Sequence, residues 1–355
     1  MSTRTALVMA GGTGGHIFPG LAVAEVLRSQ GWTVHWLGAP APSMESQLVP
    51  SKGFAFEVVA FGGVRGKGLI TLALLPMRLL KAFWQSLQVI RRLRPDVLVG
   101  LGGYISFPGG MMGVLLGKPL VLHEQNSVAG TANKVLALVA DRVMSTFPDV
   151  LPKAEWVGNP MREAFVNQAP PEVRFAHRTG PLRVVVVGGS LGAQALNSCV
   201  PQALALIPAE QRPIVLHQGG AKHLQSLQEH YAEARVEATL VSFIDDTADA
   251  FAAADLVICR AGASTVSELT ALGVAALLVP FPHAVDDHQT VNAEFLRAKE
   301  AGWLMPQISL TPEKLAEFMV NLDRHKLLKT ACNAYGMRKT TAAIDVVRAC
   351  EEVVS

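Results

Sequence analysis

The segment TALVMAGGTGGHIFPGLAVA (Thr5–Ala24) decides the fold of the first half of the chain. It begins with a short β-rich run, breaks into the glycine turn Gly11–His16, and continues with apolar residues at helical spacing. The second half opens in the same way, because LRVVVV (Leu182–Val187) breaks into GGSLGA (Gly188–Ala193) before another helical pattern. A continuous apolar strand, a glycine turn and an amphipathic helix are typical of parallel α/β sheets buried on both faces.

More apolar runs follow each opening, as a Rossmann-like sheet requires. After the first come TVHWLG, DVLVGLGG and PLVLHEQ, and after the second come PIVLHQGG, ATLVSFID, DLVICRAG and AALLVPF. The sequence therefore predicts an α/β protein of two Rossmann-like, doubly wound parallel-sheet domains, over residues 1–163 and 164–339. The polar segment Val166–Gly180 contains two adjacent prolines and no apolar period, and it is interpreted as the linker.

Composition excludes several classes of protein. The chain has 355 residues, of which 50% are hydrophobic and 17% charged, so it is neither disordered nor fibrous and can bury two cores without disulfides or metals. No signal peptide is predicted at the N-terminus, and no run of about 18 apolar residues would span a bilayer. The four cysteines form no C-x-x-C pair and no Cys/His cluster with zinc spacing, which favours free thiols, a cytoplasmic protein and no metal site. They are Cys199, Cys259, Cys332 and Cys350.

Charge is distributed unevenly along the chain. Residues 1–162 carry 15 lysines and arginines against 8 acidic residues, whereas the remainder carries 16 against 21. Between Arg65 and Arg94 there are seven basic residues and no acidic one. We interpret the basic, apolar run Leu69–Lys81 as a contact with an anionic membrane surface, the alternative being a core face with solvated cations. Ala82–Leu93 is expected to pack in the core, and no signal for nucleic acid is present.

Three glycine turns, at Gly11–Gly15, Gly102–Gly103 and Gly188–Gly192, each follow a predicted strand and precede a predicted helix. Such turns let a backbone approach phosphate closely at a helix N-terminus. Neither a complete G-x-G-x-x-G with a following acid nor a P-loop is present, which argues against hydride transfer and nucleotide hydrolysis. A nucleophile elbow and a D-x-D metal–diphosphate clamp are absent as well. We expect a phosphate-bearing ligand in a cleft between the two domains.

Eight motifs occur in order between about residues 5 and 350: GGTGGHIFPGLAVA, GLGGYISFPGG, LHEQNSVAGTANK, VGNPMR, VVGGSLGAQALN, FIDD, CRAGASTVSE and PFPHAVDDHQTVNA. Together they resemble the motifs of the MurG family of bacterial glycosyltransferases. The resemblance implies a GT-B fold, in which two domains face each other across a cleft and a last helix, here 340–355, returns to the N-terminal domain. It also implies inverting transfer of GlcNAc from UDP-GlcNAc to the C4 hydroxyl of MurNAc in undecaprenyl-pyrophosphoryl-MurNAc-pentapeptide (lipid I), giving lipid II.

The same resemblance implies the setting of the reaction. No cofactor or metal is required, since UDP-GlcNAc is a substrate. The protein would act peripherally on the cytoplasmic side of the bacterial inner membrane, in peptidoglycan synthesis, cell shape and cell division. Its partners would be UDP-GlcNAc, lipid I, the anionic membrane and other cell-wall synthesis or division proteins, with no nucleic acid.

The donor site implied by the resemblance is made chiefly by the C-terminal domain. Ser190 would face the diphosphate, and Arg162 would add positive charge. Glu268 would accept hydrogen bonds from the ribose hydroxyls, the alternative being a helix acid that complements the helix dipole. The implied residues are Thr13, Gly14, Gly15, Asn126, Arg162, Ser190, Ile244, Ala263, Ser264, Thr265, Val266, Ser267, Glu268, His288 and Gln289.

A base must accept the proton of the attacking hydroxyl. His16 is the candidate, because histidine exchanges a proton near neutral pH and this one lies at the tip of the first glycine turn. Two other interpretations stay open: His16 orients the acceptor diphosphate or caps the helix, or it only packs. His123 and Glu124, which end a predicted strand, are expected to face the same cleft, the alternative being that they are structural partners.

Three other functions remain to be weighed. The first is a GT-B glycosyltransferase that acts on another acceptor, such as a soluble glycoside. The second is a UDP-GlcNAc epimerase, which would run with the donor alone. The third is a non-catalytic nucleotide-sugar-binding or scaffold protein. The complete set of implied donor-site residues and the presence of His16 argue against it.

Overall fold

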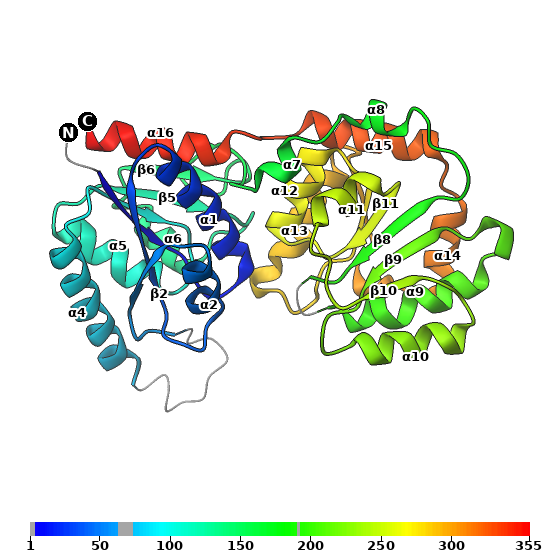
Figure 1. Ribbon diagram of the computed structural model, residues 1–355, viewed down its shortest axis with the longest axis horizontal. Helices are drawn as coiled ribbons and strands as arrows, with labels where there is room; N and C mark the ends of the chain where they lie inside the picture. Colours follow the sequence, from blue (N-terminus) through cyan, green and yellow to red (C-terminus); the bar gives the residue numbers. More distant parts are fainter. Residues whose placement is uncertain (1–3, 63–73, 190–191) are drawn as a thin grey trace. The chain divides into compact units, whose positions relative to one another are not determined.

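The computed structural model describes residues 4–62, 74–189 and 192–355. The chain divides into two compact units (Figure 1). Unit 1 comprises Met1–Arg162 and Thr340–Ser355, and unit 2 comprises Glu163–Lys339. The C-terminal segment of the chain therefore belongs to the same unit as its first 162 residues.

Unit 1 is built on a seven-stranded sheet with the order β3-β2-β1-β4-β5-β6-β7, and all of its pairings are parallel. Its strands are β1 (Thr5–Met9), β2 (Thr33–Gly38), β3 (Ala55–Val58), β4 (Val97–Gly100), β5 (Leu120–Glu124), β6 (Arg142–Ser145) and β7 (Glu155–Trp156). Its helices are α1 (Gly14–Ser29), α2 (Met44–Ser51), α4 (Leu75–Leu93), α5 (Ser106–Leu115), α6 (Thr131–Leu136) and α16 (Ala342–Val354).

Side chains alternate between the two faces of this sheet along each strand, and both faces are buried. On β1, Ala6 and Val8 share a core with Val346 of α16, whereas Leu7 and Met9 belong to a second core with helices of the opposite layer. Helix α16 packs against α1, and the two lie side by side in Figure 1. The continuous apolar strands thus reflect a sheet covered on both sides.

Unit 2 has a six-stranded parallel sheet with the order β10-β9-β8-β11-β12-β13. Its strands are β8 (Arg183–Val187), β9 (Ile214–Gln218), β10 (Thr239–Val241), β11 (Leu256–Cys259), β12 (Ala276–Leu278) and β13 (Trp303–Leu304). Its helices are α7 (Glu163–Val166), α8 (Pro171–Phe175), α9 (Gln194–Leu206), α10 (Leu224–Ala234), α11 (Thr247–Ala253), α12 (Ala263–Leu272), α13 (His288–Arg297), α14 (Pro312–Val320) and α15 (Arg324–Gly336), with short 3-10 turns at Ala209–Gln211, Val285–Asp287 and Gln307–Ser309.

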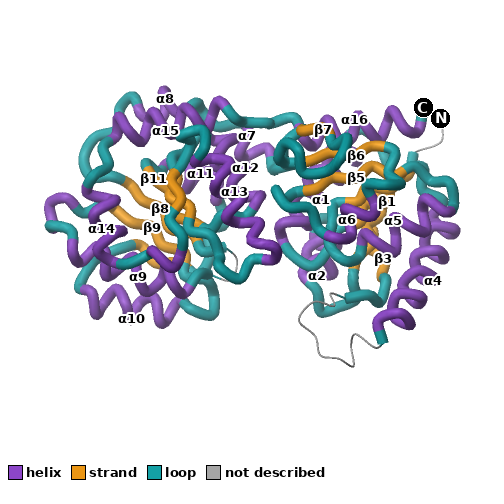
Figure 2. The backbone as a smooth tube through the Cα atoms, turned by 180° about the vertical axis from the view of Figure 1, so that it is seen from behind, coloured by secondary structure: helices purple, strands orange, loops and turns teal. Residues whose placement is uncertain are grey.

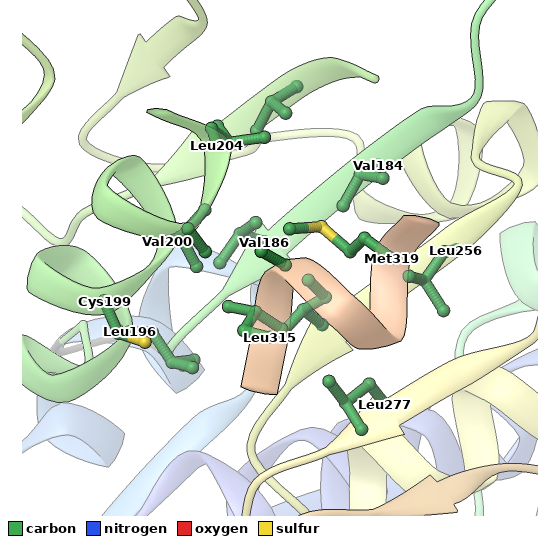
Figure 3. Packing of buried hydrophobic residues seen from close by; sticks show 14 of the residues in the cluster. Val184, Val186, Leu196, Cys199, Val200, Leu204, Leu256, Leu277, Leu315 and Met319 are labelled. Atoms are coloured by element: carbon green, nitrogen blue, oxygen red, sulfur yellow. The ribbon is translucent and has the colours of Figure 1, made fainter. Parts of the chain in front are cut away.

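One of the cores of unit 2 lies between β8 and two helices. Figure 3 shows Val184 and Val186 of β8 with Val200 of α9, and Leu315 and Met319 of α14. In each unit, Figure 2 shows the helices lying outside the strands. The prediction of two Rossmann-like parallel sheets is therefore confirmed.

The interpretation of Val166–Gly180 as a linker is wrong. Helix α8 lies inside this segment, and Phe175 is buried in the core of unit 2. The Arg174 guanidinium donates to the carbonyls of Ala252, Leu272 and Gly273. The segment is held by hydrogen bonds from arginine to buried carbonyls, which leave no apolar period in the sequence.

The structure tests the core prediction for Ala82–Leu93, whereas the membrane contact of Leu69–Lys81 stays a prediction. Ala82, Ser86, Val89 and Ile90 are buried, so one face of the later half of α4 packs in the core of unit 1 as expected, whereas Trp84 of the same half is exposed. Residues 69–73 of Leu69–Lys81 lie outside the described residues. From Leu75 onward the segment is helical, and Pro76 stands in the first turn, where a proline is tolerated. Among the described helices, none is long and apolar enough to cross a bilayer.

Candidate active site

The first group of site residues lies at the carboxyl ends of β1, β4 and β5 in unit 1. The sheet is parallel, so the loops that follow these strands meet at one edge. The β1 loop leads into α1, whose third residue is His16, and β5 ends in His123-Glu124 followed by Gln125. Gly102 lies in the loop after β4, the strand between β1 and β5.

His16 is held by a side chain of this edge. Its Nδ1 lies 2.9 Å from Oε1 of Gln125. Helix α1 has Thr13 as its N-cap, without a side-chain cap hydrogen bond, and the described bond of the His16 ring goes to Gln125 rather than to the helix backbone. This geometry favours proton transfer or acceptor positioning by His16 over helix capping.

Some glycines of this edge are needed for packing. A Cβ at Gly103 would come within 2.2 Å of the Gly11 carbonyl oxygen, and both Gly12 and Gly103 have positive φ. Gly15 is different, because it lies inside a helix and, in the part of the chain that the structure describes, a Cβ there would meet only Thr13 Oγ1, at 3.6 Å. A glycine inside a helix is destabilising unless something else needs the space. Gly15 therefore fits the predicted approach of a ligand to the backbone.

Two buried carboxylates shape the loops around His16. Glu124 is 1% exposed, and its carboxylate accepts hydrogen bonds from the backbone N–H of Asn126 at 2.9 Å and from Asn133 Nδ2 at 2.8 Å. It thereby positions the predicted donor ligand Asn126. Glu45 is fully buried below the first glycine turn and accepts from the N–H of Gly12 at 3.3 Å. Glu45 was not predicted from the sequence, where it is marked only as an acidic residue in the first turn of α2.

The second group lies at the carboxyl ends of the strands of unit 2. Helix α12 begins directly after β11 and has no side-chain cap, so its first N–H groups point toward the loop edge. Among the described residues, a Cβ at Gly262, the N-cap, would have no neighbour nearer than 4.0 Å, and its φ is negative. Neither packing nor conformation requires glycine here, which leaves room for a ligand at the helix N-terminus.

The predicted run Ala263–Glu268 separates into two faces of α12. Ala263, Val266 and Ser267 are buried, and Ser267 Oγ donates to the Ala263 carbonyl at 2.9 Å. Because these side chains pack inside the unit or bond within the helix, the three residues can contact a ligand only through backbone groups. Ser264, Thr265 and Glu268 are half-buried. In the described part of the chain, Ser264 Oγ is buried without a hydrogen-bond partner, as a hydroxyl awaiting a ligand would be.

Gln289 joins two strand ends through one atom. Its Oε1 accepts hydrogen bonds from the N–H of Ala261 after β11, at 3.3 Å, and of Phe281 after β12, at 3.0 Å. His288 is the first residue of α13 and Ile244 is buried just after β10. Both stand at the same edge of the sheet as Gln289.

The remaining predicted residues differ in exposure. Arg162 is exposed at the last position of the first segment of unit 1. Thr13 and Gly15 are exposed and Gly14 is half-buried. Ser190 lies outside the described residues. Within the described ranges, no three His, Cys, Asp or Glu side chains are grouped so as to hold a metal ion.

Comparison with known proteins defines the class first. The family model for the glycosyltransferase family 28 N-terminal domain matches residues 6–145, and the model for the C-terminal domain matches residues 183–345. The protein is thus a two-domain glycosyltransferase. A crystal structure of Acinetobacter baumannii MurG superimposes with a TM-score of 0.85 and 38% sequence identity, covering 98% of this chain and 99% of that one.

Two relatives carry the full enzyme name UDP-N-acetylglucosamine–N-acetylmuramyl-(pentapeptide) pyrophosphoryl-undecaprenol N-acetylglucosamine transferase. That of Paracidovorax citrulli is 66% identical over 352 residues, which cover 99% of each chain. That of Polaromonas naphthalenivorans is 67% identical over 354 residues, covering 99% of this chain and 98% of the relative. The chain belongs to the MurG family, and the predicted GT-B fold and glycosyltransferase class are confirmed.

Proposed function

We propose that this protein transfers N-acetylglucosamine from UDP-GlcNAc to the C4 hydroxyl of the N-acetylmuramyl residue of lipid I, forming lipid II and UDP. The observation that carries the proposal is the full-length identity of more than 60% to relatives named for this transfer. Relatives that share two thirds of their residues over the whole chain share their fold throughout.

The proposed chemistry is a single displacement with inversion. The C4 oxygen of the acceptor forms a bond to C1 of GlcNAc while the bond from C1 to the β-phosphate oxygen breaks, and UDP leaves with the electron pair. The acceptor proton passes to His16, the base at the edge of unit 1. The half-buried position of His16 and its fixed hydrogen bond to Gln125 support this role.

Positive charge must stabilise the diphosphate as it leaves. In this proposal the N-terminus of α12, with the unpartnered Ser264 hydroxyl and the open space at Gly262, receives the phosphates. Glu268, on the next turn of the same helix, accepts hydrogen bonds from the ribose hydroxyls. Arg162 adds positive charge, and no cofactor or metal takes part, so we expect chelation of divalent ions to leave turnover intact.

The decisive experiment incubates the purified protein with radiolabelled UDP-GlcNAc, with and without a short-chain analogue of lipid I. Labelled lipid-linked disaccharide and an equal amount of UDP, formed only with acceptor, are expected. UDP release or sugar isomerisation without acceptor would instead indicate a hydrolase or an epimerase. Binding of UDP-GlcNAc without turnover would favour a binding protein or a different acceptor.

The role of His16 has its own test in the same assay. His16→Ala is expected to lower kcat by about 100-fold or more, which is the scale of general base catalysis. Both KM values are expected to change little. A loss of tenfold or less would assign His16 to acceptor positioning instead.

We further propose that α4 holds the protein peripherally on the cytoplasmic side of the membrane. Met77, Leu80 and Trp84 are 66%, 68% and 59% exposed and recur every three or four residues, so they form one stripe. Arg78 and Lys81 are exposed beside it. An exposed apolar stripe flanked by cations fits a bilayer surface with anionic lipid, where an undecaprenyl-linked acceptor resides.

The proposed product defines the protein's place in the cell. Lipid II carries a complete disaccharide-peptide unit, so the reaction that consumes it polymerises the sugar chain of the cell wall. The protein would thereby contribute to cell shape and division. Contacts with other cell-wall synthesis or division proteins stay a prediction.

A further inference from the structure

A chain of three hydrogen bonds runs from His16 into the interior of unit 1. His16 Nδ1 lies 2.9 Å from Gln125 Oε1, and Gln125 Nε2 lies 3.1 Å from His123 Nδ1. His123 Nε2 lies 2.8 Å from the carbonyl oxygen of Gly158, which follows β7. The chain thus connects the first turn of α1 with the ends of β5 and β7.

Two backbone carbonyls determine the direction of every bond in this chain. The Gly158 oxygen can only accept, so His123 Nε2 carries a proton. Gln125 Nε2 also lies 3.3 Å from the carbonyl oxygen of His123, and this second acceptor requires the amide NH₂ on that side. Gln125 Oε1 consequently faces His16 and can only accept, so the proton between them belongs to His16 Nδ1.

We infer that Gln125 and His123 are positioning residues that hold neutral His16 as its Nδ1–H tautomer and so keep Nε2 as the proton-accepting nitrogen. In water the neutral histidine side chain favours the opposite, Nε2–H tautomer. The inference rests on the proposed role of His16 as the base, and it adds which of its atoms takes the acceptor proton.

The surroundings keep this chain in one arrangement. His123 is fully buried and Gln125 is 1% exposed, so water does not compete for their bonds. Burial lowers the pKa of His123 to about 4, and the neutral ring leaves Nδ1 able to accept from the Gln125 amide. At Gly102, where φ is +86, a Cβ would come within 2.9 Å of His16 Nδ1 and 3.3 Å of Gln125 Oε1. The absence of a side chain at Gly102, in the loop after β4, therefore leaves room for the hydrogen bond between His16 and Gln125.

The tautomer can be read directly from long-range ¹H–¹⁵N correlation spectra of the whole protein, with the His16 signals assigned by their loss in His16→Ala. At a pH where the ring is neutral, the expected pattern is that of an Nδ1–H imidazole. An Nε2–H pattern in the unsubstituted protein would overturn the inference, whatever the variants do.

Two substitutions test the part played by Gln125. Gln125→Leu removes the acceptor and is expected to return His16 to the Nε2–H tautomer and to lower kcat by about 100-fold, with the donor KM little changed, since a wrong tautomer disables a catalytic base. Gln125→Glu still accepts from Nδ1–H and is expected to keep the tautomer and to restore part of kcat. An unchanged tautomer in Gln125→Leu would contradict the inference.

A matched control separates positioning from stability. Ser145→Ala removes another fully buried hydrogen bond of unit 1, from Oγ to the Phe147 carbonyl at 2.8 Å, and is expected to leave the His16 spectrum and kcat unchanged. Because the spectra need no substrate, the two proposals fail separately. Absence of transfer with an Nδ1–H pattern overturns the proposed function, whereas transfer with an Nε2–H pattern overturns the positioning role.

Discussion

At the scale of single residues, substitutions of Gly102 and Gly117 distinguish the effect of backbone strain from the effect of a contact with His16. Both have positive φ, at +86 and +67. A Cβ at Gly102 would meet His16 and Gln125, whereas one at Gly117 would meet no described residue within 4 Å. Alanine at either position costs stability, roughly 1 kcal/mol for the conformation alone. Gly102→Ala is expected to lower kcat at least about tenfold as well, since small misplacements of catalytic groups are costly.

The measurement compares kcat and the thermal midpoint of both variants with those of the unsubstituted protein. Gly117→Ala is the control and is expected to retain kcat. Equal losses of kcat in the two variants would mean that the space at Gly102 does not serve His16.

Glu268 is the residue on which the assignment of the ribose site depends. Glu268→Ala is expected to raise the donor KM by about 10- to 100-fold, the range for hydrogen bonds to a charged group, and to leave the acceptor KM unchanged. Initial rates with each substrate varied in turn measure both constants. An unchanged donor KM would return Glu268 to the alternative role of complementing the helix dipole.

At the scale of elements, the stripe on α4 predicts where the membrane is contacted. Replacing Met77, Leu80 and Trp84 together by Ala is expected to weaken binding to anionic vesicles about tenfold or more, since each large apolar side chain contributes roughly 1.5–3 kcal/mol when buried. Co-sedimentation with vesicles of anionic and of zwitterionic lipid measures it. Ile308→Ala, at a position 94% exposed in unit 2, is the control. Binding that ignores anionic lipid would contradict the membrane proposal.

The segment that follows helix α8 is anchored to unit 2 by Arg178, which pairs with a buried aspartate. Asp255 is fully buried, pairs with Arg178 at 2.8 Å and accepts from the N–H of Arg183 at 2.8 Å. Asp255→Asn leaves a largely buried arginine without its counter-charge, which is expected to cost about 3–5 kcal/mol. Thermal unfolding measures this loss. Glu294→Gln, which breaks an exposed pair with Arg297, serves as the control, and an equal effect of the two variants would refute the anchoring role.

At the scale of the whole molecule, acid is expected to destabilise both units. Burial lowers the pKa of His123 in unit 1 to about 4 and that of His217 in unit 2 to about 3. The unfolded chain binds these protons at about pH 6.5 and the folded one does not. The contribution of these two histidines to the free energy of unfolding is therefore complete well above about pH 6.5 and falls as the pH drops toward these lower values, by about 2 kcal/mol per histidine at pH 5.

Urea unfolding at about pH 7 and about pH 5 measures this dependence. His217→Gln removes one of the two titrating groups and is expected to reduce the loss of stability between the two pH values. The same loss in both proteins would show that His217 does not contribute to acid sensitivity.

The two parallel sheets could be predicted because their strands are buried on both faces and read as continuous apolar runs ending in glycine turns. The strands β3, β6, β7 and β13 were not predicted. They are short, and all four lie at or beside a sheet edge, where each has half-buried or exposed side chains, so their apolar signal is weak. The polar segment with α8 was misinterpreted for a related reason, because arginine–carbonyl hydrogen bonds hold it in place.

By itself, the sequence determined the fold class, the membership in the MurG family and the candidate base, because these follow from local patterns and ordered motifs. Only the tertiary structure decided which side chains of Ala263–Glu268 face inward, and that Gln125, His123 and the Gly158 carbonyl orient His16. Hydrogen bonds between residues about 110 or 35 positions apart arise from the strand order of the sheet. No local pattern in the sequence encodes them.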